Sequence, residues 1–143
     1  MKAKINITGH VTIEIDGKIV KEIHNLVVGT GLAWVASKLY SAGTPEGDAA
    51  FMAMGTGTTP AATGDTNLET ELLPRTSISS TTVVGNTITY EATFAETGTV
   101  DQITEAGLFV DAVGGTMIAR TVFDAINKQS DDQITATWTL TIN

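Results

Sequence analysis

The last segment of the chain limits the fold more than any other feature. From Ile134 to Ile142, apolar residues alternate with threonine at every second position, which is the period of a β-strand with one buried and one exposed face. The inward set is Ile134, Ala136, Trp138, Leu140 and Ile142, and the outward set is Thr135, Thr137, Thr139 and Thr141. A helix cannot keep either set on one side. The segment therefore predicts a sheet with Trp138 in its core.

Strand and turn patterns fill most of the remaining chain. The predicted strands are Val11–Ile15, Lys18–Ile23, Ala50–Met54, Ser77–Val84, Thr87–Phe94, Ile103–Val110 and Thr116–Phe123, several of them separated by the turn dipeptides Asp16–Gly17, Gly85–Asn86 and Gly114–Gly115. The 25 threonines of the chain favour strands over helices. The short turns predict mostly antiparallel neighbours.

One helix is predicted, over about residues 30–41. Leu32, Val35, Ala36 and Leu39 share one face at helical spacing, and Thr30 can cap the start. A second, single helical turn is expected at 67–73. We therefore predict an all-β fold, an antiparallel β-sandwich or jelly roll with one short flanking α-helix. The 143 residues suit one domain, 1–143, in which residues 1–8 are either an earlier strand or an extended arm.

Several classes of protein are disfavoured by composition. The chain has no cysteine, so disulfides, thiolate metal sites and a cysteine nucleophile are excluded. No apolar run approaches the ~18 residues that cross a membrane, and the first residues lack the apolar core of a signal peptide. The net charge of -8 argues against nonspecific binding of nucleic acid, which needs a basic surface.

Candidate catalytic and metal-binding residues are few. His10 and His24 flank the first predicted hairpin, but a metal site needs a third ligand and the expectation is two surface histidines. Ser77, Ser79 and Ser80 lie in no nucleophile motif. The sequence predicts no enzyme, no catalytic residue and no cofactor.

Two loops superficially suggest ligand sites. The segment 55–60 begins Gly-Thr-Gly, yet a proline stands where a dinucleotide-binding loop has its third glycine and no phosphate-binding lysine follows. We interpret it as a tight loop leaving a buried strand. Asp65, Glu69 and Glu71, or Asp131 with Asp132, offer oxygen ligands for calcium without the spacing of an EF-hand, so a solvated acidic surface is the expectation and no metal is predicted.

Charge is distributed unevenly along the chain. Residues 1–40 contain five lysines and three acids, a sum of +2, whereas residues 41–143 contain three basic and thirteen acidic residues, a sum of -10. A basic end on an acidic body can dock on an acidic partner. The alternative is a solvated strand edge that lysines protect from pairing.

Five segments together resemble small structural proteins of tailed bacteriophages. They are Asn25–Leu32, Met52–Pro60, Ile103–Phe109, Gly114–Arg120 and Thr137–Ile142. The resemblance runs from about Val11 to the C-terminus. The pair of motifs EAGLF and GGTMIAR, at 105–109 and 114–120, is also similar to a module of phage tail-fibre and baseplate proteins.

The resemblance implies a virion protein, most like the capsid decoration, or cement, proteins. Such a protein would sit as a homotrimer on the capsid exterior, bind the major capsid protein of the HK97-like fold, and be made in the cytoplasm of the host bacterium without binding nucleic acid or membrane. The alternative is a tail, baseplate or fibre-attachment subunit. The resemblance to decoration proteins, combined with the charge distribution, suggests Lys2, Lys4, Lys18 and Lys21 as the capsid contact.

Overall fold

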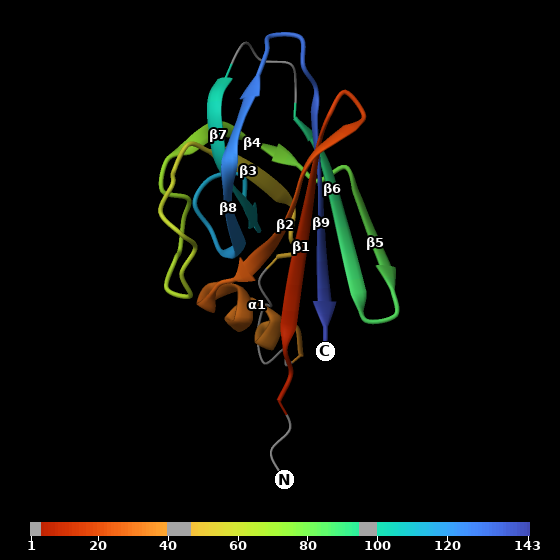
Figure 1. Cartoon of the computed structure of the whole chain (residues 1–143). Helices are drawn as coiled ribbons and strands as arrows, with labels where there is room; N and C mark the ends of the chain where they lie inside the picture. The colour runs from red at the N-terminus through yellow and green to blue at the C-terminus, as the bar shows by residue number, and fades with distance from the viewer. Residues whose placement is uncertain (1–3, 40–46, 95–99) are drawn as a thin grey trace.

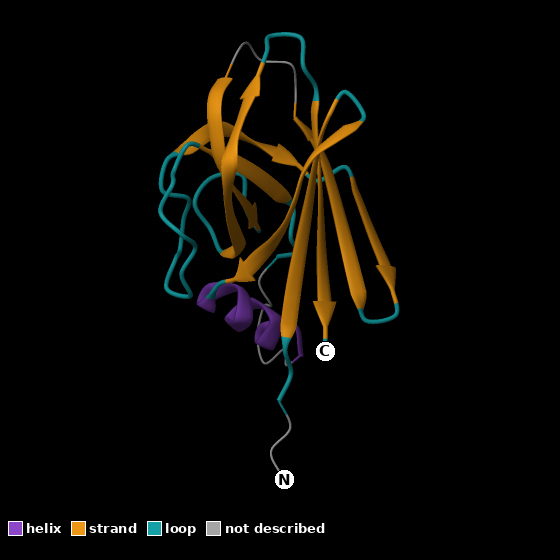
Figure 2. Ribbon diagram, viewed as in Figure 1, coloured by secondary structure: helices purple, strands orange, loops and turns teal. Residues whose placement is uncertain are grey.

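The computed structural model describes residues 4–39, 47–94 and 100–143, and in them nine strands and one helix. The strands are β1 (Ile7–Ile15), β2 (Lys18–Val27), β3 (Phe51–Gly55), β4 (Glu71–Ser77), β5 (Ser80–Val84), β6 (Thr87–Phe94), β7 (Val100–Phe109), β8 (Met117–Lys128) and β9 (Ile134–Ile142), and the helix is α1 (Gly29–Leu39). The prediction of an all-β protein with one short helix is confirmed (Figure 2).

The strands form one antiparallel sheet in the order β4-β3-β7-β8-β2-β1-β9-β6-β5. β2 connects its two halves, because it pairs with β1 from Lys18 to Asn25 but with β8 only at Leu26 and Val27. The sheet curls at this joint, so that its halves face each other as in a sandwich (Figure 1). The jelly-roll arrangement stays a prediction that this strand order does not confirm.

The core lies between the two halves of the curled sheet. Trp138 and Val11 enter it from one half, and Leu108 and Ile118 from the other, and all four are completely buried. Along β9, buried and half-buried residues alternate from Ile134 to Thr141. The predicted alternation of β9 and the core position of Trp138 are thereby confirmed.

The helix is present, but of the expected apolar face of Leu32, Val35, Ala36 and Leu39 only Val35 packs against the core. Leu32 and Leu39 are 50% and 73% exposed, while Gly31 and Trp34 are the buried residues. Backbone contact decides the orientation: a Cβ on Gly31 would lie 1.9 Å from the carbonyl oxygen of Ile118. Only a glycine permits α1 to approach β8 this closely, and this contact turns the leucines outward.

Polar bonds fix α1 in the same orientation. The indole Nε1 of Trp34 donates to the carbonyl oxygen of Gly47 at 2.8 Å. The hydroxyl of Thr30, expected to cap the helix, donates instead to the carbonyl oxygen of Met117 at 2.6 Å. The end of the predicted helix, residues 40 and 41, lies outside the described residues.

Three further boundaries differ from expectation. The helical turn predicted for 67–73 is absent, and Glu71 instead begins β4, which pairs with β3. The strand predicted from Ser77 to Val84 is interrupted because the N–H of Ile78 donates to Ala50 and that of Ser79 to Glu91. Within residues 1–8, β1 begins at Ile7, and residues 1–3 lie outside the described part. Among described residues, no helix is long and apolar enough to span a bilayer.

Candidate functional site: the ion-paired loop on the β7–β8 hairpin

The lysines predicted to contact a partner do not form one cluster in the described part of the chain. Lys4 precedes β1, whereas Lys18 and Lys21 follow the turn at the opposite end of β1 (Figure 1). The nine residues of β1 between these sites correspond to about 30 Å of extended chain. Lys2 lies outside the described residues. The structure therefore brings Lys18 and Lys21 together and keeps Lys4 apart from them.

A register shift places Lys18 and Lys21 on the same face of the hairpin. Strict alternation would put residues three apart on opposite faces. The shift follows Ile13, so Lys21 lies opposite Ile13 and Lys18 lies opposite Ile15, and opposed residues in an antiparallel pair point the same way. Both lysines therefore lie on the side of the hairpin that Ile13 and Ile15 occupy, where Lys21 is half-buried and Lys18 is exposed.

Acidic residues lie beside these two lysines. The N–H of Asp16 donates to the carbonyl oxygen of Gln133, and the N–H of Gln133 donates to Oδ1 of Asp16, each at 3.0 Å. These bonds join the β1–β2 turn to the β8–β9 turn, which contains Asp131 and Asp132. The acidic β8–β9 turn is thus held against the turn that precedes Lys18, and the lysine contact stays a prediction.

The two histidines face each other on the β1–β2 hairpin. His10 is paired with His24, and their ring centroids are 5.7 Å apart with the rings at 71°. No group of three or more potential metal ligands occurs among the described residues. His24 is exposed and His10 half-buried, which agrees with the expectation of surface histidines.

A buried carboxylate organises the loop between β3 and β4, residues 56–70. Glu105 of β7 is completely buried. Its Oε1 accepts the backbone N–H groups of Gly57 at 3.0 Å and Thr70 at 2.8 Å, and its Oε2 accepts that of Glu69 at 3.0 Å. The Gly57 amide that a phosphate would need is therefore occupied by an internal carboxylate. Gly57 must be a glycine, because a Cβ there would lie 2.6 Å from Oε1 of Glu105.

Arg120 of β8 completes this centre. Its Nε and Nη2 donate to Oε2 of Glu105 at 3.0 and 2.9 Å, its Nη1 donates to Asp65 at 2.9 Å, and its Nη2 also donates to the carbonyl oxygen of Thr59 at 3.0 Å. Arg120 is only 2% exposed. Burial alone would lower the pKa of Arg120, but the hydrogen bonds and charges of Glu105 and Asp65 raise it above its ordinary value. Glu105 and Arg120, with Asp65 and the loop amides, are called the loop clamp below.

Glu69 belongs to the exposed rim of the loop clamp. The pKa of Glu69 is lowered, first by hydrogen bonds from the hydroxyl and N–H of Thr59 and then by the charge of Arg120. Its Oε2 accepts the Thr59 N–H at 2.8 Å and lies 3.8 Å from Nη2 of Arg120. Asp65 and Glu69, considered as calcium ligands from the sequence, therefore bind an internal cation.

A second arginine secures the other end of the β7–β8 hairpin. Arg75 of β4 lies 3.5 Å above the ring of Phe109, and its Nη1 donates to the carbonyl oxygens of Asp111 at 2.8 Å and Gly114 at 2.7 Å. Its Nε and Nη2 donate to the carboxylate of Glu71, the third residue of the acidic group considered for calcium. Arg120 thus holds loop 56–70 against the hairpin, and Arg75 holds the turn of the hairpin against β4.

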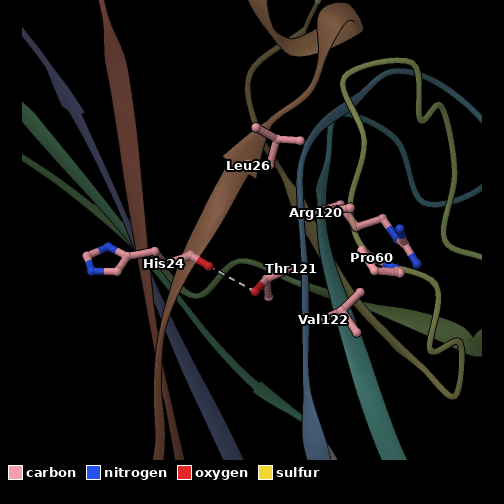
Figure 3. Close-up of a pocket in the computed structure, with 7 residues that line it drawn as sticks. His24, Leu26, Pro60, Arg120, Thr121 and Val122 are labelled. Atoms are coloured by element: carbon pink, nitrogen blue, oxygen red, sulfur yellow. Dashed lines mark hydrogen bonds between the residues drawn. The ribbon is translucent and has the colours of Figure 1, made fainter.

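A small pocket adjoins the loop clamp where β2 and β8 separate. Its volume is about 260 Å³, and Leu26, Pro60, Arg120 and Val122 contribute to its wall (Figure 3). Beside it, the hydroxyl of Thr121 donates to the carbonyl oxygen of His24 at 3.2 Å. The imidazole of His24 points away from the pocket (Figure 3). The wall offers apolar surface and no paired nucleophile and base.

Sequence reasoning missed the loop clamp, although a signal was present. Glu105 directly precedes the apolar run 106–110 and Arg120 directly follows the apolar run 117–119, and a buried charge requires a partner. The predicted Gly114–Gly115 turn folds these two strands against each other, and in the structure Arg120 lies opposite Gly107, two residues from Glu105.

Comparison of the chain with models of protein families, with curated proteins and with solved structures finds no match.

Proposed function

We propose that this chain is a structural protein of a tailed-bacteriophage virion, a capsid decoration protein that binds the outside of an HK97-like shell. One observation carries the proposal. The motifs on which the resemblance rests, 105–109 and 114–120, begin with Glu105 and end with Arg120, and these two residues form the buried ion pair of the loop clamp. The resemblance therefore falls on a single structural unit.

The physical demands of cementing are consistent with this unit. A decoration protein must hold neighbouring shell subunits together against internal pressure, and a surface that is ordered before binding loses less conformational entropy on contact. Three backbone N–H groups of loop 56–70 donate to one buried carboxylate, which two further bonds tie to Arg120. Its exposed residues include Thr58, Pro60, Ala62 and Thr66, which are small and uncharged. Weak contacts of this kind gain strength when several copies engage together.

The second candidate is a tail, baseplate or fibre-attachment subunit. The same motif pair favours it, since that pair also resembles a module of those proteins. The two candidates differ in stoichiometry: a decoration protein occupies the whole shell lattice, whereas a tail subunit is present in a few copies.

The deciding experiment measures the copy number of this polypeptide in purified virions by quantitative mass spectrometry, relative to the major shell protein. A ratio comparable to the shell protein is expected. A small fraction of that ratio would favour the tail candidate, and absence from the particle would refute both.

The lysine contact is tested on expanded capsids with matched charge reversals. The variant Lys18→Glu/Lys21→Glu changes one end of β1, and Lys4→Glu changes the other. We expect the first variant to lose capsid binding, and the second variant shows whether the predicted contact includes Lys4. Saturation of capsids by the double variant would refute the assignment of Lys18 and Lys21.

A further inference from the structure

The two edges of the sheet differ in their capacity to accept another strand. β4 and β5 are the terminal strands of the sheet. β4 contains Pro74, which has no N–H to donate, and its pairing with β3 is irregular between Met52 and Met54. It also carries Glu71 and Arg75. Proline, charge and irregular pairing are the features by which proteins prevent edge-to-edge association, so the β4 edge is protected.

The β5 edge has none of these protective features. Its five residues, Ser-Thr-Thr-Val-Val, pair with β6 in an unbroken register, and all five are exposed. Val83 and Val84 are 65% and 71% exposed. β5 is thus an extended strand rich in β-branched residues, and no described strand pairs with its outer edge. This is the geometry that accepts an added strand.

Charge identifies the occupant. Each copy carries a net charge of -8, so two copies repel each other least where their contact surface carries no net charge. Lys38 and Asp48, which line a pocket together with Thr81 and Val83 of β5, are paired with each other. No charged residue occurs between Thr76 and Tyr90, a stretch that includes all of β5. The nearest acid on the paired strand is Glu91, opposite Ser80 at the start of β5.

We propose that β5 pairs antiparallel with β5 of a second copy, about a two-fold axis at Thr82. In this register Ser80 lies opposite the second copy's Val84, and Thr82 lies opposite Thr82. The two Glu91 side chains then lie at opposite ends of the shared ladder, whereas parallel pairing would bring them together. The two-fold contact uses the same strand on both copies and is closed, so it produces a dimer. This inference is independent of the proposed virion role.

Charge substitution at the two-fold position provides the first test. In Thr82→Lys, two like charges meet directly across the ladder, which is destabilising. Thr66→Lys is the matched control, because Thr66 is also exposed but lies in loop 56–70. By analytical ultracentrifugation, we expect wild type and Thr66→Lys to reach twice the monomer mass of 15.0 kDa with rising concentration, and Thr82→Lys to lose the dimer.

Mixing separates a lost interface from a failure to fold. Thr82→Lys and Thr82→Glu are each expected to be monomeric alone and to form a heterodimer when combined, because opposite charges then face each other. The absence of cysteine allows a further check: Thr82→Cys should form an intermolecular disulfide on oxidation, and Ala125→Cys, exposed on β8, should not.

Three results would overturn the inference. They are a wild-type protein that stays monomeric at all concentrations, an oligomer unchanged by Thr82→Lys, and no heterodimer on mixing. If the unchanged oligomer has the mass of three copies, the result favours the trimer that the resemblance implies.

Discussion

Replacement of Glu105 by glutamine tests whether the loop clamp holds the fold together. The substitution keeps the size of the side chain but turns one acceptor oxygen into an NH₂ donor. Oε1 of Glu105 accepts two N–H groups, and Oε2 accepts one N–H and two bonds from Arg120. Whichever oxygen is replaced, at least two buried donors lose their acceptor.

The expected loss of stability is large. An unsatisfied buried donor costs roughly 1–3 kcal/mol, and removal of one partner from a buried ion pair costs about 3–5 kcal/mol. In the variant Arg120 retains Asp65 and the carbonyl oxygen of Thr59 as acceptors. The expected loss of stability therefore lies at the lower end of the range for a broken ion pair. We predict that Glu105→Gln lowers the free energy of unfolding by about 3 kcal/mol, measured by urea denaturation with tryptophan fluorescence.

A surface ion pair supplies the matched control. Asp48 pairs with Lys38 at 2.8 Å, but the Asp48 side chain is 93% exposed. Asp48→Asn makes the same carboxylate-to-amide change and should alter the free energy of unfolding by less than about 1 kcal/mol. Hydrogen exchange adds a local measurement, since the amides of Gly57, Glu69 and Thr70 should lose protection in Glu105→Gln. A change no larger than that of the control, with these amides still protected, would refute the assigned role of Glu105.

Three further predictions concern the loop rim, the core and the helix. Because the pKa of Glu69 is lowered in the folded state, its contribution to stability is present above the ordinary value of 4.5 and is lost as the pH falls through the lowered pKa; Glu69→Gln should therefore reduce the loss of stability in acid denaturation below pH 4.5. Trp138 is completely buried, and its Nε1 has no hydrogen-bond partner among described residues. Trp138→Ala should lower the free energy of unfolding by roughly 3–5 kcal/mol, and Trp138→Phe should lower it distinctly less. An unchanged melting temperature for the alanine variant would contradict the β9 assignment. Gly31→Ala forces a Cβ toward the carbonyl oxygen of Ile118 and should cost about 1–3 kcal/mol by displacement of α1, measured by thermal denaturation beside the exposed control Ala36→Ser.

Alternation predicted β9 and β6 well because one face of each of these two strands packs against the core. Along β9 buried and half-buried residues alternate from Ile134 to Thr141, whereas on β6 the inward residues Tyr90 and Ala92 are buried and Ile88 and Phe94 are half-buried. Periodicity failed for α1, where both the leucine side and the Gly31 side are apolar and the pattern alone cannot rank them. The deciding contact is the close approach of the Gly31 backbone to the backbone of Ile118. Because this contact depends on the lack of a side chain, it leaves no trace in the hydrophobic pattern.

The lysine surface shows a different limit of sequence reasoning. A sum of charge over residues 1–40 assumes that neighbours in sequence are neighbours in space. The β1–β2 hairpin separates Lys4 from Lys18 by the length of β1, and the bonds between Asp16 and Gln133 bring the acidic β8–β9 turn beside Lys18. The first effect follows from a hairpin that the sequence predicts. The second depends on contact between segments distant in the sequence, which hydrophobic patterns do not specify.

The charged residues at the ends of the EAGLF and GGTMIAR motifs are explained by the fold and not by binding of a partner. Glu105 and Arg120 hold loop 56–70, and a Cβ on Gly107 would lie 2.7 Å from the ring of Phe109. Gly114 and Gly115 have φ values of +63° and +69°, which other residues rarely adopt. These residues are required for the hairpin to form whatever the protein binds. Choice of partner therefore falls to residues outside the motifs, such as Lys18 and Lys21 for the shell and β5 for a second copy, and substitutions there should change association without changing stability.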